Sequence, residues 1–286
     1  FQGDQSTRAL RLILETGINE ILFSELNNAP TDNENLKISI LPTQQISYWL
    51  DVFLSEKLPA GEVETQLWEK LWLDSSWIDS NDRLNELQQQ KIISKITAAF
   101  IDLNIVRFEI FSTEDQNDID TQLEEQILSA QNICSRWGFS NSISDGVALL
   151  IRESNFYLKL LSNKAQLEAI DFFKLHKVFS DSIVAMCWIY LAISSKDSNP
   201  EQLLETGNES IENIKQILSW QPKTLLHELS PPFDGNTVMS MTSLEQGPRI
   251  QIILDRLTEL AAIGELHNHD DAVNMAIELC SNFDEI

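Results

Sequence analysis

The only cluster of metal-ligand side chains in this sequence lies near its C-terminal end. His267, His269, Asp270 and Asp271 bring two imidazoles and two carboxylates together within one short segment. A His-x-His pair followed by Asp occurs in metal-dependent hydrolases, where these groups hold a divalent cation. In those enzymes the pair usually ends a strand, whereas here it lies between two expected helices. The cluster therefore gives one hypothesis, a metal-dependent or small-molecule helical enzyme.

The same residues also fit the start of a helix. Asn268 or His269 can cap the first turn, and Asp270 and Asp271 would then oppose the positive helix end. The sequence contains no Gly-rich phosphate-binding loop, no Gly-x-Ser-x-Gly nucleophile elbow and no Glu-x-x-His pair of a di-iron bundle. We therefore favour the helix start, predict no cofactor and expect a non-catalytic protein.

Tryptophan is concentrated in the N-terminal part of the chain. Trp49, Trp68, Trp72 and Trp77 are four of only seven tryptophans. Because Trp dominates the energetic centres of protein interfaces, these four residues are predicted to contact a protein partner. The alternative is the core of a helical hairpin, since Trp68 and Trp72 continue an apolar helical stripe. Trp77 has polar neighbours and is expected to be the most exposed of the four.

The strong negative charge restricts the kinds of partner. Twenty Lys and Arg residues stand against 44 Asp and Glu residues, for a net charge of −24. Direct binding to nucleic acid or to an anionic membrane is not expected, because both require basic side chains. We predict an interaction or regulatory module that binds another protein with a basic surface. A second alternative is a nucleic-acid mimic that occupies a basic groove.

The composition and the hydrophobic pattern predict an all-α fold. Glycine (9 residues) and proline (8 residues) are scarce, which disfavours the many turns of β-sandwiches and barrels. Apolar residues recur with helical period, for example over 82–103, and Pro200-Glu201 is typical of a helix start. About ten helices are expected, in a bundle or an irregular array. Alternating residues over 36–41 and 105–111 could add one short two-stranded ribbon.

The acidic segment 113–120 is the best candidate for a domain boundary. It would separate an N-terminal helical region, 4–112, from a C-terminal helical region, 121–286, although one continuous domain also fits. The longest apolar run, 183–193, is shorter than the ~20 residues of a membrane span and is therefore expected to be a buried helix. Three widely spaced cysteines suit a reducing compartment, so we predict a cytoplasmic protein.

Overall fold

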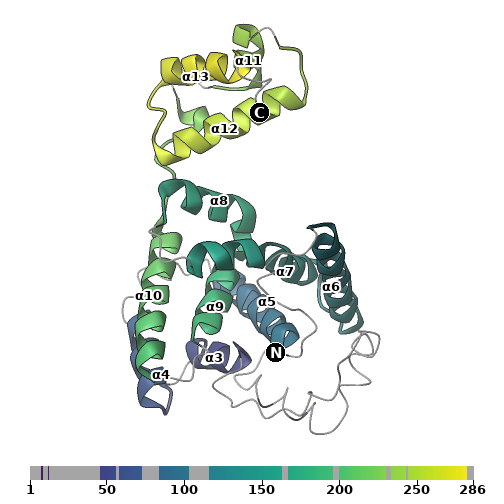
Figure 1. Ribbon diagram of the computed structural model, residues 1–286, viewed down its shortest axis with the longest axis vertical. Coiled ribbons are helices and arrows are strands. Elements are labelled where there is room, and N and C mark those ends of the chain that lie inside the picture. The colour runs from purple at the N-terminus through teal and green to yellow at the C-terminus, as the bar shows by residue number, and fades with distance from the viewer. Residues whose placement is uncertain are drawn as a thin grey trace. The chain divides into compact units, whose positions relative to one another are not determined.

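In the computed structural model, the described elements of secondary structure are helices (Figure 1). No strand occurs among the residues that it describes, which confirms the all-α prediction. The predicted ribbon segments, 36–41 and 105–111, lie outside the described residues. The structure describes Arg8, Leu12 and residues 46–55, 58–72, 84–102, 116–162, 167–195, 200–229, 233–242 and 244–281.

The chain forms two compact units, and each is formed from separate stretches of sequence. The first unit comprises residues 1–165 and 179–218, and the second comprises residues 166–178 and 219–286. The units therefore divide the chain at other positions than the acidic segment 113–120. Part of that segment is helical, because α6 begins at Gln116 and packs along α7 within the first unit.

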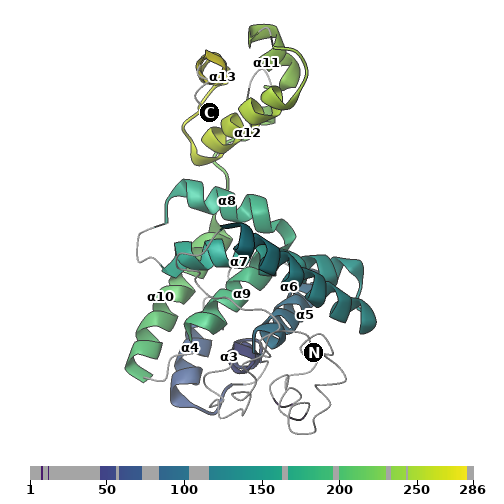
Figure 2. The same cartoon turned by 45° about the vertical axis from the view of Figure 1, so that its right-hand side comes forward.

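The first unit is built around α9, an apolar helix that lies against α3, α5 and α7 (Figure 1 and Figure 2). Nine of the twelve α9 residues are buried, which explains why its sequence shows no polar face. Its described helices are α3 (Ile46–Phe53), α4 (Glu62–Trp72), α5 (Leu84–Asp102), α6 (Gln116–Arg136), α7 (Asn141–Ser162), α9 (Ile183–Ser194) and α10 (Pro200–Ser219).

The apolar run predicted to be a buried helix lies within α9. Taken together with the preceding helix, the stretch Ala169–Ser194 is long and apolar enough to cross a membrane by length and composition. Most of its apolar window is nevertheless buried in the structure, as is usual for a core helix. A short 3₁₀ turn, Ser180–Ser182, interrupts the stretch, and Ser180 has a positive φ of 38°.

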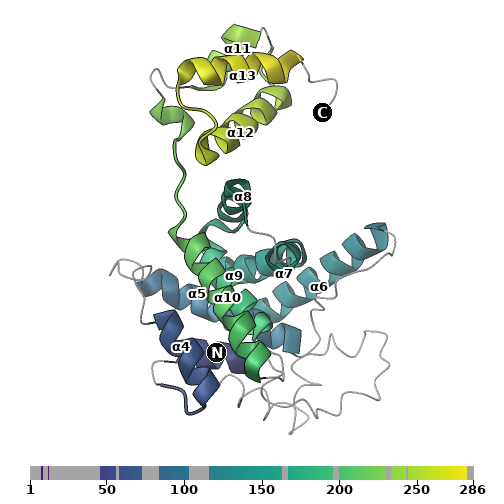
Figure 3. The ribbon, with the colours of Figure 1, turned by 60° about the vertical axis from the view of Figure 1, so that its left-hand side comes forward.

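The second unit contains a small hydrophobic core between α11, α12 and α13, which pack against one another (Figure 3). Its described elements are α8 (Ala169–Phe179), a 3₁₀ turn (Leu226–Glu228), α11 (Gly235–Thr242), α12 (Pro248–Ile263) and α13 (His269–Ser281). The buried side chains of this core include Phe233, Val238, Ile253, Leu257, Leu260 and Leu266.

The sequence after Trp220, with Pro231-Pro232 and Asp234-Gly235, has the composition of a loop, yet α11 begins at Gly235. Asp234 starts this helix by accepting hydrogen bonds from the backbone N–H and the hydroxyl of Thr237, both at 2.9 Å. These bonds lower the pKa of the Asp234 carboxyl, with the backbone N–H as the main cause. The spacing of Asp234 and Thr237 is the sequence signal for this cap, but eight residues are too few to show a helical period.

Gly264 ends α12 in a conformation that other residues adopt at a cost. Its φ of 85° and ψ of 28° lie in the left-handed region, and its N–H bonds back to the carbonyl of Ala261. A β-carbon at this position would also meet the side chain of Lys223. The Lys223 N–H donates to the Ala262 carbonyl at 2.9 Å, which ties the incoming chain to the same helix end.

We expect Gly264→Ala to destabilise the second unit by roughly 1–2 kcal/mol, because alanine is strained at this φ. Gly235→Ala is the matched control, since a β-carbon there would make only ordinary contacts at 3.6 Å. Amide hydrogen exchange over residues 248–281 measures both effects. Equal protection in the two variants would contradict the role assigned to Gly264.

Candidate functional site

The three described tryptophans of the predicted partner surface belong to a hairpin of α3 and α4. Trp49 is fully buried and stacks on Phe53, with ring centroids 5.7 Å apart. Trp68 and Trp72 lie on α4, are half-buried and have ring centroids 6.4 Å apart. Trp49 is therefore a core residue with no surface to offer a partner. Trp77 lies outside the described residues.

The indole N–H groups of α4 bind the C-terminal end of α3. Trp72 Nε1 donates to the Phe53 carbonyl at 2.9 Å, and Trp68 Nε1 donates to the Ser55 carbonyl at 3.1 Å. The Phe53 carbonyl ends α3 without an intrahelical donor, and the Ser55 carbonyl lies just beyond the helix, so each indole satisfies a group that would otherwise need water. These two contacts explain why tryptophan, with its N–H donor, stands at both positions.

The other end of α3 is held by α5. Asp102 accepts hydrogen bonds from the backbone N–H groups of Ile46 and Ser47, at 3.0 and 2.8 Å. Further along α5, the ammonium group of Lys95 lies 3.2 Å from the carboxylate of Asp51, and the Lys95 side chain is only 1% exposed. A charge this deeply buried requires an opposite charge beside it. The sequence did not predict this ion pair.

The C-terminal His and Asp cluster forms the start of α13. Asn268 Oδ1 accepts from the Asp271 N–H at 2.9 Å, and the Asp271 carboxylate accepts from the His267 N–H at 3.1 Å. These reciprocal bonds resemble a capping box, shifted by one residue. Asp270 also lies in the first turn and is exposed. The cluster therefore begins a helix, as expected, and of the two candidate caps it is Asn268 that caps it.

The cluster does not converge on a common point in space. The His269 ring packs against Phe233, with centroids 5.4 Å apart, whereas His267 is exposed. Among the residues that the structure describes, no three His, Cys, Asp or Glu side chains are grouped so that they could hold a metal ion. Capping and ring packing account for His269 and Asp271.

The buried cysteines are not poised as nucleophiles. Burial raises the pKa of the Cys134 thiol to about 11 and raises the pKa of the Cys187 thiol further. Because the thiolate is the reactive form, both side chains stay protonated and unreactive at neutral pH. Their positions in the core of the first unit fit small apolar side chains.

A row of exposed carboxylates lies along α10. Glu201, Glu205, Glu209 and Glu212 follow one another at intervals of three or four residues, so they share one face of the helix. The row extends over about 16 Å at a rise of about 1.5 Å per residue. The buried residues of the same helix fall on the opposite face: Leu203, Gly207, Ser210, Ile211, Ile214 and Ile217.

The buried face of α10 fixes the direction in which this row points. Ser210 Oγ donates to the hydroxyl of Tyr190 on α9 at 3.3 Å. A β-carbon on Gly207 would lie 2.8 Å from Leu67 of α4, so glycine permits a close approach of the two helices. Lys70 of α4 forms an ion pair with Glu212 at 3.1 Å, at one end of the row. The row therefore faces solvent along the outer side of the first unit.

Comparisons with known proteins add no functional assignment to this geometry. No protein-family model, curated protein sequence or solved structure matches the chain.

We expect Asn268→Ala to destabilise α13 by about 1 kcal/mol, because the Asp271 N–H loses its cap. His267→Ala is the matched control, since only the backbone N–H of His267 takes part in the capping bonds. Hydrogen exchange over residues 269–281 and metal analysis of the purified protein are measured together. A stoichiometric metal that His267→Ala removes would contradict the capping role and restore the metal hypothesis.

Tyr48 gives a prediction about alkaline pH. Burial, followed by its hydrogen bond to Glu64 at 2.9 Å, raises the pKa of the Tyr48 phenol to about 12 from its usual 10.0. A raised pKa in the folded state stabilises the fold below pH 10 and loses this contribution as pH rises toward 12. We expect Tyr48→Phe to remove a late tyrosinate step from an alkaline titration followed by ultraviolet absorbance. If Tyr48→Phe instead removes a step near the usual phenol pKa, the burial of the Tyr48 phenol is contradicted.

Proposed function

We propose that this chain is a non-catalytic interaction or regulatory module that binds another protein through its acidic surface. The carboxylate row of α10 is the observation that carries the proposal. It is the longest ordered row of exposed like charges among the described residues, and helix packing holds it in one direction. A partner with a basic helix or strand of similar length would meet several carboxylates at once.

The middle of the row, where Glu205 and Glu209 are four residues apart, is unfavourable for the free chain, which supports a cationic partner. Like charges at i and i+4 on a helix destabilise it by about 0.2–0.5 kcal/mol per pair. Lys70 lies at ion-pair distance from Glu212, at one end of the row. Basic side chains of a partner would relieve the repulsion between Glu205 and Glu209 in its middle. They would also speed association, in a manner that salt suppresses.

The test uses the chain as bait for affinity purification from source-cell lysate, at low and at high salt. The proteins that it retains are compared with those retained by two double charge-reversal variants. Glu205→Lys with Glu209→Lys inverts the middle of the α10 row. Glu125→Lys with Glu278→Lys is the matched control, because both glutamates are exposed and lie on other helices. We expect a basic protein to be retained by the unmodified chain and the control, and lost from the α10 variant.

Two outcomes would count against this proposal. Equal loss in both variants would mean that only the net charge matters and that α10 has no special role. Equal retention in both would remove α10 from the interface altogether. Competitor DNA is added in a parallel experiment. If DNA displaces the captured protein from the chain, the partner's nucleic-acid site is the surface that α10 occupies, as in a nucleic-acid mimic.

A further inference from the structure

The hydrophobic core of the second unit is formed by one continuous stretch of sequence. The buried side chains of this core that the structure describes lie between Leu226 and Ala276, on α11, α12, α13 and the segments that join them. Helix α8 belongs to the same unit, and all of its residues are described, but none of them is part of this core. The three C-terminal helices therefore do not need α8 in order to bury their apolar faces.

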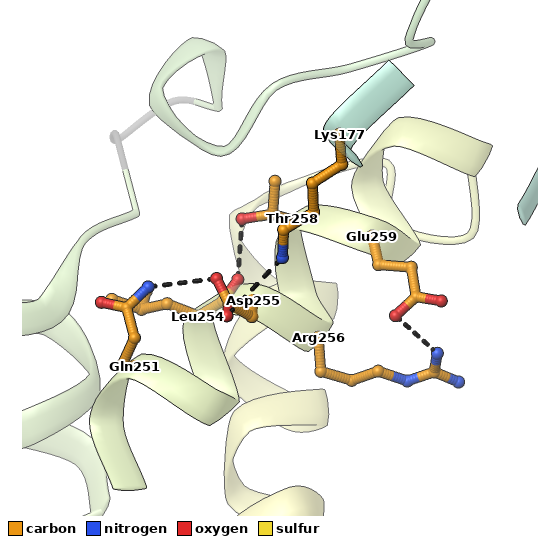
Figure 4. A network of polar contacts seen from close by, with 7 residues as sticks. All are labelled: Lys177, Gln251, Leu254, Asp255, Arg256, Thr258 and Glu259. Carbon is orange, nitrogen blue, oxygen red and sulfur yellow. Dashed lines mark hydrogen bonds and ion pairs between the residues drawn. The ribbon is translucent and has the colours of Figure 1, made fainter. Parts of the chain in front are cut away.

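Most of α8 is not buried within the unit. Among the described residues 167–178, Leu175 alone is buried, and the others are half-buried or exposed. The ammonium group of Lys177 lies 3.6 Å from the carboxylate of Asp255 on α12 (Figure 4), but both side chains are about half exposed. An ion pair on the surface contributes little to stability, because solvent and salt screen both charges. This ion pair is therefore not what holds α8 in place.

Trp220 packs its indole ring against α8. Its ring centroid lies 5.2 Å from that of His176 and 6.4 Å from that of Phe173. Both distances fall in the range of about 4.5–7 Å over which aromatic rings attract one another. Trp220 lies in the connection 219–225, which is described throughout and leads from α10 to the core, and none of its residues is buried. The indole therefore joins α8 to a part of the unit that is otherwise exposed.

We propose that Trp220 is a latch that holds α8 on the C-terminal helices, and that its release lets α8 separate while α11, α12 and α13 stay folded. One aromatic contact changes an equilibrium about two- to tenfold, so the two contacts of this indole leave the open state as a minor population. Opening would uncover the rings of Phe173 and His176, and a ligand that bound them would shift the unit toward the open state. This device does not depend on the carboxylate row of α10.

Amide hydrogen exchange on the full chain, followed by mass spectrometry, tests the latch. An isolated helix of eleven residues is marginal in water, so the α8 amides exchange whenever the helix separates. In the unmodified chain we expect exchange over 170–178 to be at least about tenfold faster than over 253–263 of α12. Trp220→Ala should speed exchange over 170–178 about fivefold further and leave 253–263 unchanged. Phe173→Ala with His176→Ala removes the other side of the latch and should have the same effect.

Two further variants serve as controls. Trp137→Ala removes another half-buried indole that packs on an aromatic ring, that of Phe139 in the first unit, and should leave exchange over 170–178 unchanged. Lys177→Ala removes only the surface ion pair and should change this exchange by less than about twofold. Equal exchange of α8 and α12 in the unmodified chain would overturn the latch, as would no change over 170–178 in the Trp220 variant. Joint loss of protection from α8 and α12 in both latch variants would show that they open as one unit, which also contradicts the proposal.

Discussion

The buried ion pair between Lys95 and Asp51 is the interaction on which the first unit depends. Removing an ammonium group from water costs several kcal/mol, so Lys95 can be buried only where a carboxylate meets it. Asp51 lies on α3, which has only eight residues and is too short to be stable alone. The position of α3 is therefore set by the groups that bind it, and the ion pair is one of these constraints.

The remaining contacts of α3 follow from the same constraint. Asp102 satisfies the N–H groups at its start, and the indoles of Trp68 and Trp72 satisfy carbonyls at its end. Because α3 is fixed at both ends and in the middle, it provides a stable packing surface for α9, which has no polar face of its own. The tryptophans of this hairpin thus have a structural reason, independent of any partner, for their positions.

Local signals in the sequence predicted the helices well. Pro200 marked the start of α10, and the cluster around Asn268 marked the start of α13. Such signals act within one turn of helix, so a single sequence contains them. The short helix α11 was missed because its cap at Asp234 has no long apolar stripe behind it.

The features that long-range contacts create could not be predicted in this way. Lys95 looks like an exposed lysine until Asp51 is placed beside it by the fold. A shallow pocket lined by Gly235 and Gly247 likewise exists only because the fold brings the starts of α11 and α12 together. The pattern of charge was partly predictable, since the composition alone indicated an acidic surface. Its arrangement in a row required the helical register of α10 and the knowledge of which face is buried.

Under the proposed function, the acidic row would affect the rate of binding more than its selectivity. Exposed carboxylates act over about 8 Å at physiological salt, so a row of them speeds the approach of any basic partner without selecting among such partners. Selection among basic proteins requires short-range contacts with directional hydrogen-bonding groups. An acidic chain that used only its charge would bind basic proteins indiscriminately. Under the proposed function, selectivity would therefore have to come from short-range contacts in addition to the charge.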